Sequence, residues 1–179
     1  MTSASVAWSE IVVRLADERT YWLSTVGPHG SPHVCPVWGV IVEDAWYFYS
    51  ERRTVKARNL AANPRVALNL GSGEDVLIVH GLVYDNGHPA DHPDVVAAFS
   101  AKYTRPHDLE FLPLADPAFD VMYVLAPSHA LMWKLADYVG SQRRWRPESA
   151  PAAATPDERS GARDSATDAA GQPVRTAES

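Results

Sequence analysis

The sequence contains very little cysteine: Cys35 is the only one among its 179 residues. A single cysteine excludes an intrachain disulfide. Cys35 lies within an apolar strand pattern, where a buried thiol behaves as a small hydrophobic side chain. We therefore interpret it as a core residue rather than as a reactive nucleophile.

Long hydrophobic runs are also missing. No apolar stretch is long enough to cross a bilayer as a helix, and no signal-peptide hydrophobic region is present. The sequence therefore predicts a cytoplasmic protein with no membrane partner.

Large apolar side chains disappear towards the C-terminus. From Pro147 to Ser179 only Val174 is large and apolar, and the rest is mostly small, polar or charged. Such a segment cannot bury enough surface to offset the entropy of ordering it. We expect one domain at residues 1–146 and a disordered Ala/Pro/Ser-rich tail at residues 147–179.

Positive charge is scarce overall, since the chain has a formal net charge of -6. The tail holds three arginines and six acidic residues, which leaves a net charge of -3 on residues 1–146. A nucleic-acid partner usually requires a broad basic face. The charge therefore argues against nucleic acid and in favour of a small anionic ligand.

One basic cluster stands out from this acidic background. Arg52, Arg53, Lys56 and Arg58 place four positive charges within seven residues, at the start of a short helix that ends before Pro64. Cationic side chains and free backbone N–H groups at a helix start form a favourable phosphate site. A solvated basic turn is the competing interpretation.

Alternating and β-branched stretches predict a strand-rich domain with few helices. The expected strands are 20–26, 33–42, 45–50, 66–70, 75–84, 119–125 and 130–135, and the expected helices are 5–18, 54–62 and 88–102. Glu43-Asp44 has the composition of a tight hairpin turn. This order indicates a mostly β (α+β) fold built as a small, largely antiparallel barrel.

Two other constellations lack support. The segment 88–94 holds two histidines and two aspartates at metal-like spacing, but Pro89 and Pro93 interrupt that face, so we predict no metal site. Ser24 and His33 suggest part of a catalytic triad, but no nucleophile elbow accompanies them, which argues against hydrolysis.

The residues that resemble a known family are Tyr21–Val26, Gly30–Trp38, Tyr47-Phe48 and, most specifically, Lys56–Val66, with Trp133 and Gly140–Arg146 near the end. Over residues 15–146 the chain resembles the pyridoxamine-5′-phosphate-oxidase-like split-barrel family, and more narrowly its flavin/deazaflavin-dependent oxidoreductases. The resemblance implies a six-stranded antiparallel split β-barrel with short flanking helices. It also implies a homodimer with FMN or a related flavin in the groove between the subunits.

The resemblance further indicates which residues hold the cofactor, while no catalytic residue is assigned. The candidates are Val37, Trp38, Ser50, Arg53, Thr54, Lys56, Asn59, Trp133 and Trp145. Arg53, Thr54 and Lys56 match the phosphate positions, with Ser50 as a hydroxyl donor, and backbone groups around Val37 and Trp38 face the ring.

Two of these candidates have equally good alternatives. The amide of Asn59 can instead tie the helix to a neighbouring strand, because a buried amide must find partners in any case. Trp145 follows the last expected strand and is flanked by arginines. It is either a cap on a partner subunit's site or a docking anchor on the surface.

Two functions of different classes fit these residues. The first is an oxidoreductase that binds FMN or a deazaflavin of the coenzyme F420 type and moves a hydride to or from a small organic substrate. The second is a module of the same fold that binds or sequesters a flavin or haem without turnover. The Arg-x-His pair of authentic pyridoxamine-phosphate oxidases has no match, because Gln142–Arg146 stands in that region, so that activity is not expected.

Overall fold

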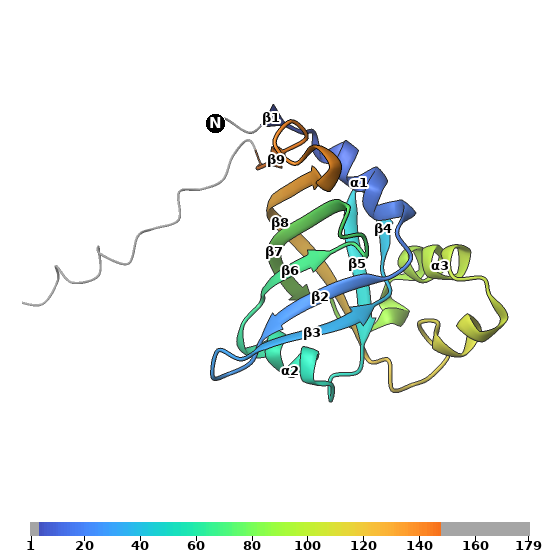
Figure 1. Ribbon diagram of the computed structural model, residues 1–179. Coiled ribbons are helices and arrows are strands. Elements are labelled where there is room, and N and C mark those ends of the chain that lie inside the picture. Colours follow the sequence, from blue (N-terminus) through green and yellow to red (C-terminus); the bar gives the residue numbers. More distant parts are fainter. Residues whose placement is uncertain (1–3, 148–179) are drawn as a thin grey trace, which may run out of the picture. The chain divides into compact units, whose positions relative to one another are not determined.

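The computed structural model describes residues 4–147 (Figure 1). The segment 148–179, where the sequence predicts a disordered tail, lies outside the described residues. The elements are β1 (Ala4–Ser5), α1 (Trp8–Asp17), β2 (Tyr21–Val26), β3 (Pro32–Val37), β4 (Val40–Val42), β5 (Ala45–Ser50), α2 (Val55–Ala62), β6 (Arg65–Asn69), β7 (Asp75–Asp85), η1 (Pro89–Asp91), α3 (Pro93–Lys102), η2 (Pro106–Phe111), β8 (Val121–Lys134), η3 (Leu135–Asp137) and β9 (Arg143–Trp145). None of the described helices has the length and apolar character needed to cross a membrane.

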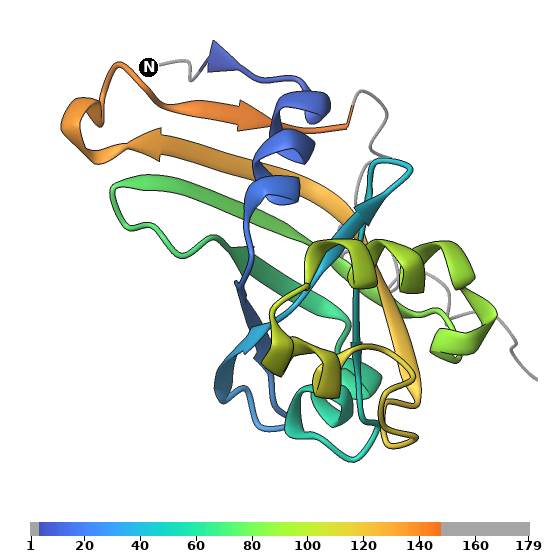
Figure 2. The same ribbon diagram turned by 90° about the vertical axis from the view of Figure 1, so that its right-hand side faces the viewer.

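The nine strands of residues 4–147 form one sheet that bends back on itself (Figures 1 and 2). The order is β1-β9-β8-β7-β6-β2-β3, and β5 pairs with both β4 and β8. Strand β8 therefore has β7 along one edge, with β5 and β9 sharing the other edge. Strands β3 and β4 each have one partner, so the barrel is open between them and the expected split-barrel fold is confirmed.

The opening of the barrel lies where the sequence predicts one continuous strand at 33–42. The structure breaks this strand at Trp38-Gly39, so that β3 pairs with β2 while β4 pairs with β5. A Cβ atom on Gly39 would lie 2.4 Å from Nε1 of the buried Trp46, so the crossing requires glycine. The prediction of a single strand was wrong because this close approach favours a break.

In β8 the structure joins two predicted strands instead of dividing one. The sequence predicts two strands joined at Pro127-Ser128, whereas β8 runs without interruption. A register shift between His80 and Gly81 on β7 faces this proline and lets the ladder continue past a residue that cannot donate a hydrogen bond. The seven strands predicted from the sequence pattern thus become nine, because β8 merges two of them, β3 and β4 divide one, and β1 and β9 are added. The resemblance implied six.

The tight turn predicted at Glu43-Asp44 is confirmed. Both residues are left-handed, with φ of 50° and 62°, as a two-residue turn between antiparallel strands requires. The turn joins β4 to β5 and thereby returns the chain to the barrel.

Two apolar clusters fill the fold. The larger occupies the barrel interior and includes Ile11 and Leu15 of α1, both fully buried. The smaller lies beneath α3, where Phe99 and Tyr103 pack with Val40 of β4. Helix α3 therefore covers the β4 side of the opening (Figure 2).

Candidate functional site

A cavity of about 270 Å³ opens at the split of the barrel. It is lined by Thr20, Pro36, Val37, Trp38, Tyr49, Lys56, Phe111 and Phe119, and we refer to it as the split pocket. Because β3 is an edge strand, the backbone N–H and C=O groups along one of its sides have no strand partner in residues 4–147. The pocket thus combines four aromatic rings, one cation and an edge strand.

The ring of Trp38 is held in place by two neighbours, Tyr103 and Arg19. Its ring lies 4.2 Å from the ring of Tyr103, with 10° between the planes. The guanidinium carbon of Arg19 is 5.5 Å from the Trp38 ring centroid and 5.0 Å from that of Tyr103. The Gly39 N–H donates to the Tyr103 hydroxyl at 2.9 Å, so both residues of the strand crossing are held in place.

Another wall of the split pocket comes from the segment between α3 and β8, which contributes Phe111 and Phe119. Phe111 meets the Trp38 ring edge-on, and the Tyr49 hydroxyl donates to the Phe111 carbonyl. Burial raises the pKa of Tyr49, so its hydroxyl stays neutral and able to donate. The buried Asp108 of η2 forms an ion pair with Arg19 at 2.5 Å, which fixes this segment to the wall behind Trp38.

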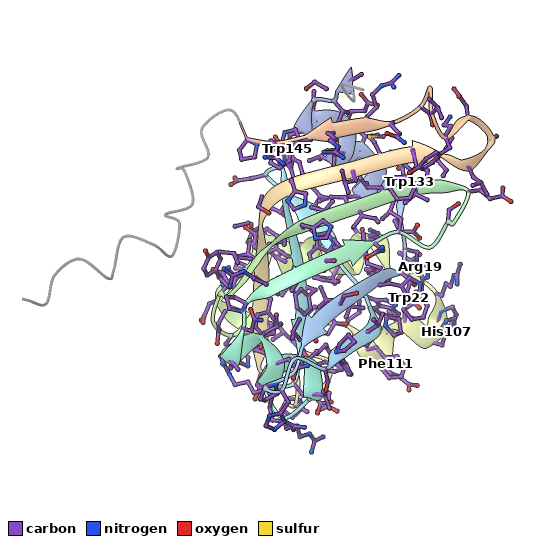
Figure 3. All side chains as sticks on the ribbon, turned by 60° about the vertical axis from the view of Figure 1, so that its left-hand side comes forward. Arg19, Trp22, His107, Phe111, Trp133 and Trp145 are labelled. Carbon is purple, nitrogen blue, oxygen red and sulfur yellow. The ribbon has the colours of Figure 1, made fainter. Side chains whose placement is uncertain are left out.

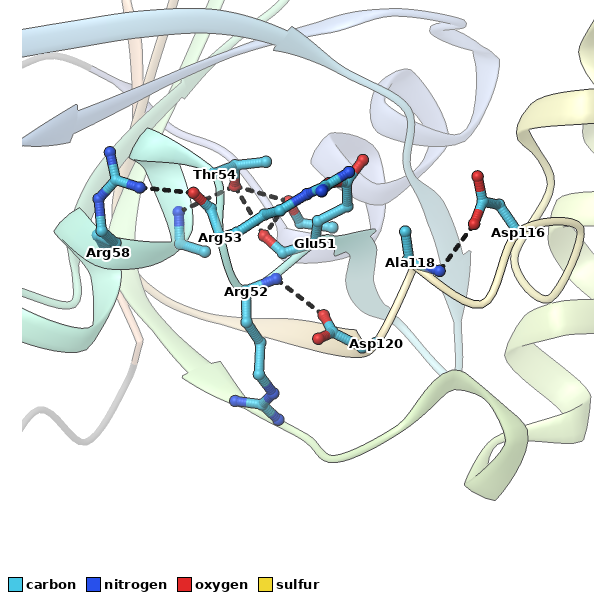
Figure 4. A network of polar contacts seen from close by, with 10 residues as sticks. Glu51, Arg52, Arg53, Thr54, Arg58, Asp116, Ala118 and Asp120 are labelled. Carbon is cyan, nitrogen blue, oxygen red and sulfur yellow. Dashed lines mark hydrogen bonds and ion pairs between the residues drawn. The ribbon is translucent and has the colours of Figure 1, made fainter.

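The cations of the basic loop have different partners (Figure 4). Arg52 forms a two-pronged ion pair with Asp85, and the hydrogen bonds from Arg52 hold its guanidinium pKa above the usual value. Arg53 Nε donates to Glu51 at 2.5 Å, but the Arg53 side chain is 81% exposed. Lys56 forms no ion pair within residues 4–147 and lines the split pocket, which makes it the cation best placed to meet an anionic ligand there.

The hydroxyl groups of Ser50 and Thr54, which the resemblance places at the phosphate, contact each other and the backbone of the basic loop. The hydroxyl oxygens of Ser50 and Thr54 are 3.1 Å apart, and Thr54 donates to the Glu51 carbonyl at 2.8 Å. Thr54 also caps α2 by accepting from the Ala57 N–H. The groups left for an anion at this helix start are the first backbone N–H groups, which have no partner inside the helix.

Asn59 has the structural role that the sequence analysis gave as the alternative to cofactor binding. It is buried, with 4% of its surface exposed, and its Nδ2 donates to Thr25 Oγ1 at 3.0 Å. This bond ties α2 to β2. Asn59 does not line the split pocket.

Trp133 and Trp145 lie at the other end of the sheet from Phe111 (Figure 3). Trp145 packs against Trp8, with 4.6 Å between ring centroids, and Trp133 meets Tyr138 edge-on at 6.1 Å. Neither tryptophan lines the split pocket of its own chain.

The segment with metal-like spacing is occupied by local hydrogen bonds. His88 Nδ1 accepts from the Ala90 N–H at 3.1 Å, and His92 Nε2 lies 2.5 Å from the Asn86 carbonyl oxygen. Across residues 4–147 no group of three or more His, Cys, Asp or Glu side chains is gathered as a metal site.

The site contains residues that sequence reasoning missed, namely Thr20, Pro36, Tyr49, Phe111 and Phe119. Tyr49 belongs to the aromatic strand predicted at 45–50, and the sequence does not show which of its rings faces a pocket. Phe111 lies in a proline-rich stretch without hydrophobic periodicity, and Phe119 is predicted only as the first residue of the strand at 119–125. No local pattern therefore relates either ring to a strand roughly 70 residues earlier.

The family of the protein follows from a comparison with protein-family models. Residues 7–133 match the model described as pyridoxamine 5'-phosphate oxidase. The chain belongs to this family. Among curated protein sequences none matches the chain.

Several solved structures of this pyridoxamine 5'-phosphate oxidase fold resemble the chain. An F420 reductase is 29% identical, with 63% of this chain and 90% of that chain covered and a TM-score of 0.50. A conserved hypothetical protein of Mycobacterium tuberculosis is 22% identical over 82% of this chain and 88% of its own, with a TM-score of 0.57. A haem-binding protein of Mycobacterium smegmatis is 15% identical over 81% of this chain and 60% of its own, with a TM-score of 0.61. The last two likenesses concern the fold alone.

A partly buried lysine next to the strand crossing, Lys102, gives a pH-dependent prediction. Lys102 Nζ donates to the Tyr21 hydroxyl at 2.8 Å and to the Gly39 carbonyl at 3.0 Å, and burial lowers the Lys102 pKa to about 8 from 10.5. Above pH 8 the folded chain has released a proton that the unfolded chain still binds, so the free energy of unfolding rises with pH. Urea unfolding should show wild type gaining stability relative to Lys102→Met between pH 7.5 and 9.5. A stability difference independent of pH would contradict the prediction.

Proposed function

We propose that this protein is an oxidoreductase that binds FMN or a deazaflavin of the coenzyme F420 type and transfers a hydride to or from a small organic substrate. The observation that carries the proposal is the meeting of Val37, Trp38 and Lys56 in one pocket. The sequence suggested ring contacts for the first two and a phosphate contact for the third. The family membership and the likeness to an F420 reductase support the same class of reaction.

The donor set of the split pocket fits such a cofactor. A flavin or deazaflavin presents a flat ring with polar edges, a polyol and a phosphate. Aromatic walls suit the ring, unpaired backbone groups of an edge strand suit its polar rim, and Lys56 at the start of α2 suits the phosphate. A dry cavity of about 150 Å³ can hold benzene. A cavity volume of about 270 Å³ therefore has room for a larger ring system.

The cofactor would supply the hydride chemistry, and the chain's own residues would bind and orient it. Lys56 would neutralise the phosphate, while Trp38, fixed by Tyr103 and Arg19, would hold the ring plane. Phe111 and Phe119 would keep water from the reacting face. Arg53 would also bind the phosphate if its ion pair with Glu51 broke. Breaking that pair costs little free energy, because exposed ion pairs are weak.

The proposal is tested by the absorption spectrum and mass of the cofactor that copurifies with the protein, and by titration with FMN and with the deazaflavin. Reduction and reoxidation of the bound cofactor by a small organic acceptor would establish turnover. Tight binding without turnover would favour the second function, a non-catalytic binding module. No saturable binding of either cofactor would overturn both the enzyme and the flavin-binding module.

The homodimer is part of the same proposal, with Trp133 and Trp145 reaching the partner's pocket. The outward side chains of β7 include Val76, Ile78 and Leu82, which are only partly buried, and Trp22 on β2 is 44% exposed. These apolar side chains share the face with His80, and an exposed apolar patch of this kind usually meets a partner. Light scattering of the cofactor-free protein should give twice the chain mass.

A charge placed on this face should separate the two copies. We expect Ile78→Asp to yield a monomer, whereas Leu109→Asp, on the exposed turn η2, should stay dimeric. Wild-type protein that is monomeric yet binds cofactor tightly would contradict the shared site but leave the pocket itself intact.

A further inference from the structure

A stacked pair of histidines lies on the outer face of the sheet. His80 on β7 and His129 on β8 are direct cross-strand partners, with ring centroids 4.4 Å apart and 6° between the ring planes. Their neighbours Val79 and Ala130 point into the core, whereas both histidines are only partly buried. In a single chain the two rings therefore reach the surface side by side, and neither lines the split pocket.

The contacts of Ser128 are compatible with the His129 tautomer that leaves Nε2 unprotonated. The Ser128 hydroxyl donates its single proton to the His80 carbonyl at 3.1 Å, and the same oxygen lies 3.2 Å from His129 Nδ1. When the Ser128 proton goes to the carbonyl, Ser128 Oγ accepts from Nδ1–H of His129. The lone pair of His129 is then on Nε2. Metal-ligating histidines characteristically donate their other ring N–H in this way.

The second ring is free to act with the first. The His80 side chain makes no hydrogen bond within the part of the chain that the structure describes. Two imidazole nitrogens bound to one tetrahedral ion at about 2.0–2.1 Å lie roughly 3.3 Å apart. Because the planes of the two rings are nearly parallel, both rings must rotate about their side-chain torsions before their lone pairs can converge on one ion. Direct cross-strand partners have Cβ atoms about 4.5–5.5 Å apart, which is close enough for the rotated side chains to share an ion.

We propose that His80 and His129 form a binding site for a first-row transition metal, with His129 Nε2 as the first ligand and Ser128 as its positioning residue. Imidazole nitrogen suits zinc, copper, nickel and iron. The metal can arrive either as a hydrated ion or as the iron of haem. This site shares no residue with the split pocket, but His80 lies on the outward face of β7 that the proposed homodimer would cover.

The surroundings provide a way to distinguish these two sources. Leu131 follows His129 by two residues on β8 and therefore lies on the same face of the sheet. It pairs with the exposed Arg144 of β9, which brings a positive charge near the histidines. A positive charge near the histidines repels a hydrated cation, whereas it attracts the carboxylates of haem. Removing the Arg144 charge should therefore change the two affinities in opposite directions.

The experiment uses the untagged full-length protein, titrated with Zn²⁺ and Ni²⁺ by calorimetry and with haemin by absorbance. We expect saturable binding of at least one probe, and at least a tenfold loss of affinity for it in His80→Ala and in His129→Ala. Ser128→Ala should weaken binding about 10- to 100-fold by releasing the His129 tautomer. His29→Ala, in the exposed turn between β2 and β3, is the matched control and should bind as wild type does.

Arg144→Ala then identifies the source: stronger binding of the ions indicates a hydrated metal, and weaker binding of haemin indicates haem. One ion per chain would place the site within one copy, and one per two chains would mean that two copies share it; either supports the proposal. His80→Gln and His129→Gln, checked by thermal unfolding, replace the alanine variants if those fail to fold. Absence of binding for all probes, or equal affinity in the histidine variants and wild type, would overturn the site.

Discussion

Replacing Lys56 by alanine should weaken the binding of FMN or deazaflavin about 10- to 150-fold. A charge-assisted hydrogen bond contributes about 1.5–3 kcal/mol, which corresponds to this range of affinity. The fold should be unaffected, because Lys56 lies on a partly exposed face of α2 and alanine is a good helix former. Fluorescence titration of each cofactor against wild type and variant measures the effect.

Lys134→Ala is the matched control, since it removes the same charge from the exposed end of β8 and should leave cofactor affinity within about twofold. Arg53→Ala should have a smaller effect than Lys56→Ala, because Arg53 already has Glu51 as a partner and is exposed. Equal affinities for wild type and Lys56→Ala would remove the basic loop from the cofactor site.

Replacing Gly39 by alanine should destabilise the fold by about 3 kcal/mol, at the upper end of the usual cost of overpacking a core. The new Cβ would meet three atoms of the Trp46 indole at 2.4–2.6 Å, and Trp46 is 1% exposed. A rigid, buried indole cannot move aside without displacing its neighbours Tyr21 and Phe48. Urea unfolding of the variant should show the loss in the transition midpoint with little change in slope.

Gly73→Ala is the control for this substitution. A Cβ on Gly73 meets nothing within 4 Å, so the variant should be neutral or slightly stabilised through the unfolded chain. A Gly39→Ala protein as stable as wild type would mean that the strand crossing can rearrange, and that Trp38 is less firmly positioned than its contacts with Tyr103 indicate.

Local patterns predicted most of the fold. The Glu43-Asp44 turn and the amphipathic α1 follow from residues adjacent in sequence, and both are confirmed. The break at Gly39 could not be predicted, because its cause is an indole from another strand. The continuity of β8 past Pro127 likewise depends on a register shift in β7.

The candidate site shows the same division. Lys56 and Trp38 were accessible from motifs, since the family resemblance fixes their positions along the chain. Phe111 and Phe119 were not, because their place in the pocket depends on the ion pair between Arg19 and Asp108 and on the contact with Tyr49. These are long-range contacts that no sequence window contains.

The pairing of β5 with β8 joins residues roughly 70 positions apart, as Ser50 meets Val121. Closing so long a loop costs more entropy than forming the hairpins of β2 with β3 or β6 with β7, so it belongs to the slow part of folding. Tyr49 and Phe119 line the split pocket and lie in or next to these paired strands. Only a chain that has completed the pairing offers both walls to a ligand. A ligand of this pocket should therefore slow unfolding while leaving the folding rate unchanged.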